Sequence, residues 1–149
     1  MTNINFPTAI HRMVAACRAG EYPELITHMS SGWAVLGHSQ FLRGYSLLLP
    51  DPVVPHLNEM EPGHRQQFLS DMVQLGDVVF KATGALRINY AMFGNVEPAL
   101  HAHVIPRYAD EAPELRTAHP WMYDWSKAPL FDVHRDGVLL IQLRSVLRG

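Results

Sequence analysis

Hydrophobic positions recur along the chain with two periods, one typical of helices and one typical of strands. Apolar residues at helical spacing predict a helix from Thr8 to Ala19, ended by Gly20. A longer stripe of the same kind predicts a helix from about Pro62 or Gly63 to Thr83, closed by Gly84. A last helix is expected from about Gly137 to Leu147. The chain thus has a long helix near its middle and shorter ones towards its ends.

Shorter runs of β-branched and other apolar residues predict five strands. Glu24 to Met29 and Trp33 to Leu36 flank a Ser-Ser-Gly turn and are expected to form a hairpin. Gly44 to Leu49 is a third strand, which stops at a proline-rich loop because proline lacks a backbone donor. Ala85 to Ala91 and Leu100 to Ile105 complete the set. This order of elements is typical of an α+β fold with a mainly antiparallel sheet.

Composition indicates one globular domain. The chain has 149 residues, of which 48% are hydrophobic and 17% are charged. This balance and length suit a domain with a sizeable core. There is no internal repeat and no linker-like segment, so residues 1–149 are expected to form a single domain.

The charge balance limits the partners. The formal net charge is −2, from 12 basic and 14 acidic residues, and no block of Lys or Arg occurs. Nucleic acid is therefore not expected as a partner, because affinity for a long polyanion needs many cations. A small phosphate compound stays open, since a single phosphate site needs few donors.

Cysteine content and hydropathy favour the cytoplasm. Cys17 is the only cysteine, which excludes an intrachain disulfide and a cysteine-rich zinc site. The opening Met1 to Thr8 lacks a basic segment followed by an apolar run, so no secretory leader is expected. No stretch approaches the ~20 apolar residues that span a bilayer, so no membrane partner is expected.

The candidate chemistry centres on His101 and His103. In an extended strand these two side chains share a face, about 7 Å apart, while the residues between and beside them are apolar and suit a core. Three interpretations follow. The pair are half-exposed polar residues, or they share a metal ion, or they attack and hold one phosphorus centre. A metal needs a third ligand, and only dispersed histidines such as His38 and His56 are at hand, with no Asp or Glu at a fitting offset.

The segment Asn95 to Tyr108 resembles the signature of the histidine-triad (HIT) family, His-φ-His-φ-His-φ-φ followed by Pro-Arg, where φ is apolar. His101 and His103 match its second and third histidines, and Ala99 stands at the first. The tail beyond the motif is similar to that of a bacterial HIT-like branch. Further matches are Cys17 to Pro23 with the family's Cys, Gly-Glu-x-Pro stretch, Gly44 to Pro50 with its Gly-His-x-Leu-φ-φ-Pro strand, and Arg87 to Asn89 with a strand that carries a phosphate-side Asn.

The resemblance implies a fold and an activity. The fold would be HIT-like, with an antiparallel sheet of about five strands, a long helix and terminal helices, in a protein that forms a homodimer. The activity would be that of a nucleotide-phosphate hydrolase or nucleotidyl transferase. His101 would attack an α-phosphorus and form a nucleotidyl-histidine, with no metal and no organic cofactor. This requires a neutral imidazole whose Nε2 is free, and the main-chain carbonyl of Ala99 would hold the other nitrogen as well as a histidine carbonyl does.

Other residues take roles from the same resemblance. His103 would contact the phosphate or the leaving group, and both Asn89 and Asn95 would hold non-bridging oxygens. Asn95 is equally suited to an ordinary turn with Gly94. Arg107 is expected to be structural or to lie at a subunit contact. Trp121, Tyr123 and Trp125 lie in a tail that covers either the site or a dimer partner.

Two departures concern the nucleoside half of the site. Tyr45 stands where the family has a histidine, and Gly37 stands where it has an Asp or Asn that grips the ribose. His38 is adjacent but would point to the opposite face. A slot formed by Trp33, Leu36 and Phe41 is a candidate for stacking a base, although Trp33 and Leu36 are more often simply core residues. These departures motivate the alternative function of a non-catalytic HIT-like protein that binds a nucleotide or phosphate.

Overall fold

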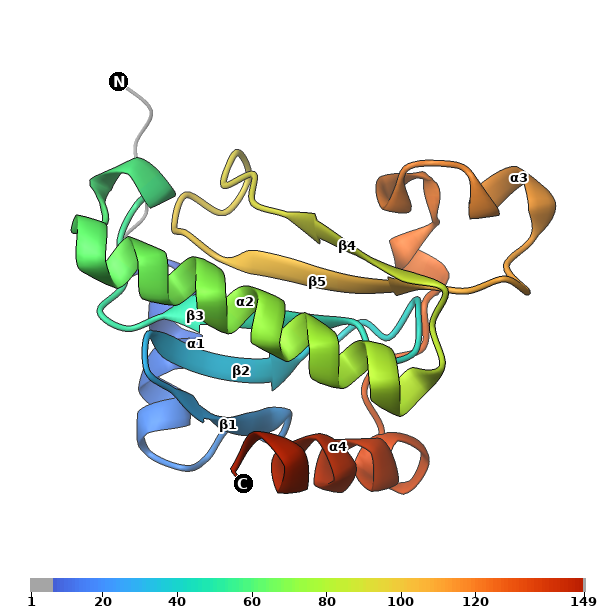
Figure 1. The fold of residues 1–149 in the computed structure, drawn as a ribbon, viewed down its shortest axis with the longest axis horizontal. Coiled ribbons are helices and arrows are strands. Elements are labelled where there is room, and N and C mark those ends of the chain that lie inside the picture. The colour runs from blue at the N-terminus through green and yellow to red at the C-terminus, as the bar shows by residue number, and fades with distance from the viewer. Residues whose placement is uncertain (1–6, 149) are drawn as a thin grey trace.

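The computed structural model describes residues 7–148, so most of the Met1 to Thr8 segment lies outside it. A five-stranded sheet has the order β1-β2-β3-β5-β4, and every pair of neighbours is antiparallel (Figure 1). The strands are β1 (Leu25–Met29), β2 (Gly32–Leu36), β3 (Ser46–Pro50), β4 (Arg87–Ala91) and β5 (Ala102–Arg107). The helices are α1 (Ala9–Arg18), α2 (Pro62–Thr83), α3 (Pro113–Arg116) and α4 (Val133–Leu147), with short 3₁₀ turns at Leu57–Glu59, Pro120–Met122 and Trp125–Lys127. The predicted α+β fold with a five-stranded antiparallel sheet is confirmed.

Helix α4 and strand β5 are among the elements whose boundaries differ from the prediction. Helix α4 begins at Val133, four residues before Gly137, because the side chain of Asp132 accepts hydrogen bonds from the backbone N–H groups of the first turn. Strand β5 begins later than predicted, at Ala102, and continues beyond Ile105 to Arg107. It passes through Pro106 because β3 pairs with β5 only as far as Val104, so the missing N–H of the proline removes no bond to β3.

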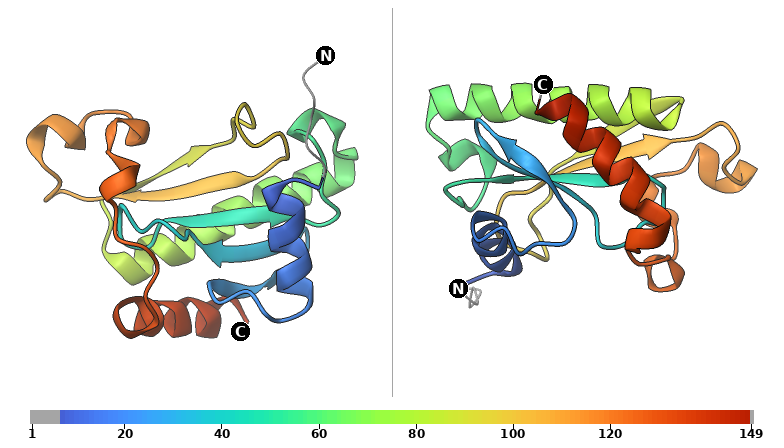
Figure 2. Two further views of the ribbon diagram at one scale, coloured as in Figure 1. Left: turned by 180° about the vertical axis from the view of Figure 1, so that it is seen from behind. Right: turned by 90° about the horizontal axis from the view of Figure 1, so that it is seen from below.

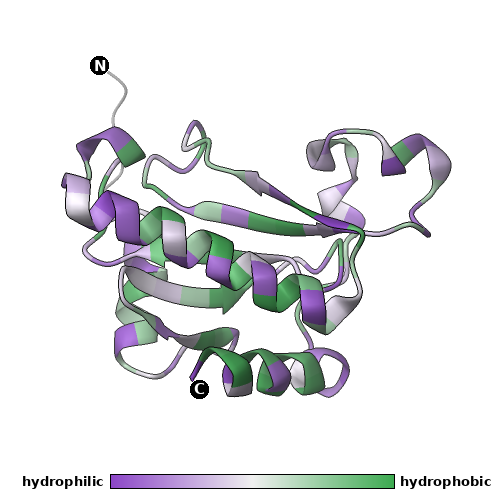
Figure 3. Cartoon of the chain, in the orientation of Figure 1, coloured by the Kyte–Doolittle hydropathy of each residue, from purple (hydrophilic) through white to green (hydrophobic). Residues whose placement is uncertain are grey.

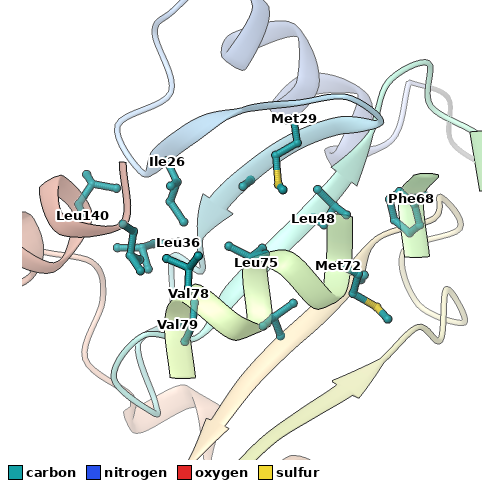
Figure 4. Close-up of a cluster of buried hydrophobic side chains, with 14 of the residues drawn as sticks. Ile26, Met29, Leu36, Leu48, Phe68, Met72, Leu75, Val78, Val79 and Leu140 are labelled. Atoms are coloured by element: carbon teal, nitrogen blue, oxygen red, sulfur yellow. The ribbon is translucent and has the colours of Figure 1, made fainter. Parts of the chain in front are cut away.

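The sheet separates two hydrophobic clusters. Helices α2 and α4 cover one face and α1 covers the other (Figure 2). Hydrophobic and hydrophilic residues alternate along α2 (Figure 3), and the buried hydrophobic ones pack on the sheet. Figure 4 shows the first cluster, in which Phe68, Leu75 and Val79 of α2 meet Leu36 and Leu48 of the sheet.

The second cluster lies on the α1 side and defines the face on which the histidines lie. Val14 and Cys17 of α1 pack there with Leu47, Leu49 and Ile105 of the sheet. Along β5 the side chains alternate, with Ala102 and Val104 in the first cluster and Ile105 in the second. His103 therefore shares the α1 side with Ile105, as the strand alternation predicts.

The two edges of the sheet differ. At β1 the guanidinium of Arg144 in α4 donates two hydrogen bonds, of 2.9 and 2.6 Å, to the carbonyl of Leu25. At β4 no other strand of the described chain pairs with the outer edge. None of the described helices is long and apolar enough to cross a bilayer.

Candidate functional site

His101 lies at the entry to β5 with its Nδ1 held by the backbone. This nitrogen is 2.8 Å from the carbonyl oxygen of Ala99. A carbonyl only accepts, so Nδ1 carries a proton, and in the neutral ring Nε2 keeps a free lone pair. The carbonyl contact expected of Ala99 is thus present, although its side chain is a methyl group. His101 has the tautomer that a nucleophile needs.

His103 is buried beside His101, with 9% of its surface exposed and the two ring centroids 4.8 Å apart. Its Nδ1 lies 2.6 Å from the hydroxyl of Tyr45, which is 4% exposed. Burial, together with the nearby His101, lowers the pKa of His103 to about 4, so the ring is neutral at pH 7. Burial also raises the pKa of Tyr45 well above its ordinary value.

A cavity of about 430 Å³ opens beside the histidine pair. Its walls are largely aromatic: Trp121 lies edge-on to His103 at 4.9 Å, and Phe93 lies edge-on to Trp121 at 5.0 Å. Among its lining residues there is no Lys or Arg. A phosphate bound there would be held by neutral donors.

Glu97 is a lining residue that sequence reasoning did not find. Its Oε1 is buried and has no hydrogen-bond partner in the described part of the chain. No periodic signal identifies it, because residues 93–98 form a loop whose course is set by the fold. An unpaired buried oxygen of this kind suits a ligand that carries a hydrogen-bond donor.

A second, smaller cavity of about 320 Å³ adjoins His101 and is lined by His56, Asn58 and Met92 among others. His101 lines both cavities. A phosphorus atom placed at His101 would therefore have space on two sides for its substituents.

The two predicted asparagines lie in different places. Asn95 lines the cavity with His101 and His103. Asn89 does not: its Oδ1 accepts a 3.0 Å hydrogen bond from Arg107, and it lines a separate hollow towards the ends of β4 and β5. The structure thus brings together three of the four predicted site residues.

Arg107 holds the segment that follows β5. It is buried, forms a 3.0 Å ion pair with Glu111, and donates to the carbonyls of Leu115, Arg116 and Ala118. Of the two roles expected for it, these contacts match the structural one.

The tail covers the site. Trp121 and Trp125 both line the cavity beside the histidines, and Tyr123 donates a 2.6 Å hydrogen bond to Glu111. The sequence left open whether the tail lies over the site or over a second subunit. In this chain it forms a wall of the site.

The stacking slot predicted from Trp33, Leu36 and Phe41 was wrong. Leu36 is fully buried in the cluster on the opposite face of the sheet, because strand alternation separates it from its neighbours in β2. Trp33 binds Asp51 through its indole N–H at 2.9 Å. Phe41 is covered by Trp125, with ring centroids 3.9 Å apart.

The metal interpretation lacks a third ligand. Among residues 7–148, no group of three or more His, Cys, Asp or Glu side chains is arranged to hold a metal ion. The two histidines are instead anchored through their Nδ1 atoms by a carbonyl and a hydroxyl.

No family model matches the chain, and no curated protein matches it. Several solved structures are similar to the chain. A histidine-triad protein from Sinorhizobium meliloti has 21% identity and a TM-score of 0.70, and the match covers 81% of this chain and 87% of that one. A histidine-triad protein from Marinobacter aquaeolei has 18% identity and a TM-score of 0.72, covering 95% and 96%.

A hypothetical histidine-triad nucleotide-binding protein from Sulfolobus tokodaii is similar over 92% of this chain and 91% of that one, with 14% identity and a TM-score of 0.69. These matches cover 81 to 95% of this chain, and they show a common fold.

Proposed function

We propose, on the premise that the chain has the histidine-triad fold, that it is a nucleotide-phosphate hydrolase or nucleotidyl transferase. The observation that carries the proposal is the 2.8 Å contact between Nδ1 of His101 and the carbonyl of Ala99, which leaves Nε2 unprotonated beside two cavities. In the first step Nε2 bonds to the α-phosphorus and the leaving group departs with the electrons of its bond to phosphorus. In the second step water or another acceptor attacks the phosphorus and releases His101.

The phosphate would be held by neutral groups. The closeness of His103 to His101 and the position of Asn95 in the same cavity support a role for both as donors to phosphate oxygens. We assign Asn89 to Arg107 rather than to phosphate, because Asn89 does not line the cavity of the two histidines and its Oδ1 accepts from that guanidinium. The nucleotide-binding description of the Sulfolobus tokodaii protein supports a nucleotide as the ligand.

The proposal is tested by covalent trapping. The protein is incubated with adenosine phosphoramidate, diadenosine polyphosphates and nucleotide sugars, and turnover and the intact mass are followed. We expect turnover of one class and a protein adduct of one nucleotidyl group, both lost in His101→Ala. The control is His134→Ala, since His134 is an exposed histidine of α4. Absence of both turnover and adduct, or full activity of His101→Ala, contradicts the proposal.

The second candidate is a non-catalytic protein that binds a nucleotide or phosphate in the same pocket. Ala99, Gly37 and Tyr45, which replace residues of the family pattern, favour it. Thermal unfolding separates the two candidates: a nucleotide-dependent rise in Tm without turnover would favour binding alone.

We further propose that the chain forms a homodimer and acts in the cytoplasm. The outer edge of β4 is open, and Val73 and Phe80 of α2 lie exposed on the same side as Tyr90 of β4, whose hydroxyl approaches Gly76. A second copy placed across a two-fold axis would cover this edge and these apolar side chains. The single cysteine is compatible with a reducing compartment.

A further inference from the structure

A buried hydroxyl holds the second histidine of the site. The Tyr45 hydroxyl and Nδ1 of His103 are 2.6 Å apart, and the two rings are nearly parallel, with an interplanar angle of 12°. Both side chains are buried. Such a contact fixes both the orientation of the imidazole and the nitrogen that carries its proton.

The direction of this hydrogen bond follows from what else the hydroxyl contacts. If the imidazole donated, the O–H of Tyr45 would need another acceptor, and among the described residues His103 is its one hydrogen-bond partner. A buried O–H without an acceptor costs about 1–3 kcal/mol. A phenol is also a stronger acid than a neutral imidazole N–H, and an imidazole nitrogen is a strong acceptor. The hydroxyl therefore donates, and Nδ1 accepts.

We propose that Tyr45 is a positioning residue that holds neutral His103 with its proton on Nε2, so that His103 donates a hydrogen bond to the phosphate that His101 attacks. The two histidines then have opposite tautomers. The Ala99 carbonyl accepts a hydrogen bond from Nδ1 of His101, so Nε2 of the neutral His101 ring carries no proton. The Tyr45 hydroxyl donates to Nδ1 of His103, so Nε2 of His103 carries the proton. Their ring centroids lie 4.8 Å apart, so both Nε2 atoms can meet one phosphate group. This inference rests on the proposed function.

Gly37 is part of the same arrangement. A Cβ at residue 37 would lie 2.3 Å from Cδ1 of Tyr45, a distance that no side chain permits. The backbone N–H of Gly37 also donates a 2.8 Å hydrogen bond to the carbonyl of Tyr45. Phe41 and Trp125 meet the tyrosine ring edge-on, with centroids at 5.2 and 5.4 Å. The ring is thereby fixed in position, and with it the donor that faces His103.

The tautomer is measured directly, with no need for a substrate. In protein labelled with ¹⁵N-histidine, two-bond nitrogen–proton couplings report which ring nitrogen carries the proton, and His103→Gln assigns the signals. At pH 7 we expect His103 to carry its proton on Nε2 in the native chain. In Tyr45→Phe, which removes only the hydroxyl, we expect a mixture of both tautomers. A native His103 protonated on Nδ1, or a Tyr45→Phe spectrum unchanged at His103, overturns the proposal.

Kinetics supply the second measurement. Tyr45→Phe should lower the rate of adduct formation about tenfold or more, with KM changed little, since orienting partners of an imidazole have effects of this size. The control is Tyr22→Phe, because Tyr22 packs against the same hydrophobic cluster and is not hydrogen-bonded to His103. An equal loss in both variants would indicate a structural effect and contradict the proposal. If no substrate reacts at all, the proposed function fails, while the tautomer measurement still decides the role of Tyr45.

Discussion

At the scale of residues, the chemistry of the site depends on the groups behind the histidines. His101 and His103 are two residues apart, yet Nδ1 of His101 contacts the carbonyl of Ala99 and Nδ1 of His103 contacts the hydroxyl of Tyr45. The first contact comes from a main-chain atom and therefore does not depend on which side chain residue 99 carries. The second depends on one side chain, Tyr45, which directly precedes β3 and is brought to β5 by the pairing of β3 with β5.

The pKa of His103 makes stability depend on pH. Burial, and to a smaller extent the nearby His101, lowers the pKa of His103 from the ordinary 6.5 to about 4. Between these two pH values the unfolded chain therefore binds a proton that the folded chain does not. The neutral, buried His103 therefore contributes to the free energy of unfolding above pH 6.5, and this contribution is lost as the pH falls towards 4. The total loss is about 3 kcal/mol. Urea unfolding at pH 7, 5.5 and 4.5 should show this loss.

Two histidine variants separate this effect from general acid instability. His103→Gln should show a smaller fall in the free energy of unfolding over the same pH range. His134→Gln, which changes an exposed histidine of α4, should fall as the native chain does. Equal pH dependence in all three proteins would show that His103 titrates normally.

The sequence alone identified those site residues whose positions follow from local structure, such as the alternation of side chains along a strand. His101 and His103 share a face because strands alternate with period two, and Asn95 lies in the loop just before them. Glu97 and His119, which also lines the cavity, were beyond such rules, and for Trp121 the sequence left open whether it covers the site or a second subunit. They reach the site through the course of loops and of the tail, which contacts distant in sequence determine.

At the scale of elements, a buried carboxylate ties the β1–β2 turn to α2. Asp71 is 2% exposed, and its Oδ2 accepts from the backbone N–H of Ser31 at 2.8 Å and from the Ser31 hydroxyl at 2.6 Å. Gln67, one helical turn earlier, donates to its other oxygen. This contact fixes the long helix against the hairpin at one end of the sheet.

Asp71→Ala should lower the free energy of unfolding by about 2 kcal/mol, because it leaves the N–H and O–H of Ser31 buried without an acceptor. Urea denaturation at pH 7 measures the change. Asp77→Ala is the matched control, since Asp77 lies on the same helix and is exposed. Its effect should stay within about 0.5 kcal/mol. Similar losses in both variants would contradict a special role for Asp71.

The elements that the sequence predicted well are those with long periodic patterns. The described α1 and α2 and all five strands appear at or within a few residues of the predicted ranges. The segment from residue 108 to 131 has no period, and its short helical turns were not predicted. Arg107 holds part of this segment by bonds to three backbone carbonyls, and that kind of contact leaves no periodic trace in a sequence.

At the scale of the whole molecule, the two sheet edges point to one association surface. At the β1 edge Arg144 binds the carbonyl of Leu25, whereas no strand of the described chain pairs with the outer edge of β4, and Val73 and Phe80 of the adjoining α2 are exposed. An open strand edge beside exposed apolar side chains is a common site of pairing between identical chains.

Val73→Asp should weaken the proposed homodimer, because it places a charge where apolar surface would be buried. Val73 is 46% exposed in the described chain. Sedimentation velocity over a range of protein concentrations measures the shift from dimer to monomer. Val138→Asp is the matched control on α4, where Val138 is 75% exposed, and it should leave the dimer intact. A native chain that sediments as a monomer at all concentrations would rule out the dimer.

The close packing of Tyr45 on Gly37 has a consequence for how this protein can change by mutation. An Asp or Asn at residue 37, the residue type that the family pattern has there, would place its Cβ within 2.3 Å of the Tyr45 ring. A histidine at residue 45 without a change at residue 37 would leave the space of the phenol ring unfilled. Each substitution alone is therefore expected to be harmful, and only the two together can be tolerated. The residue types at positions 37 and 45 are therefore coupled, and the effects of the two substitutions on the free energy of unfolding should be non-additive.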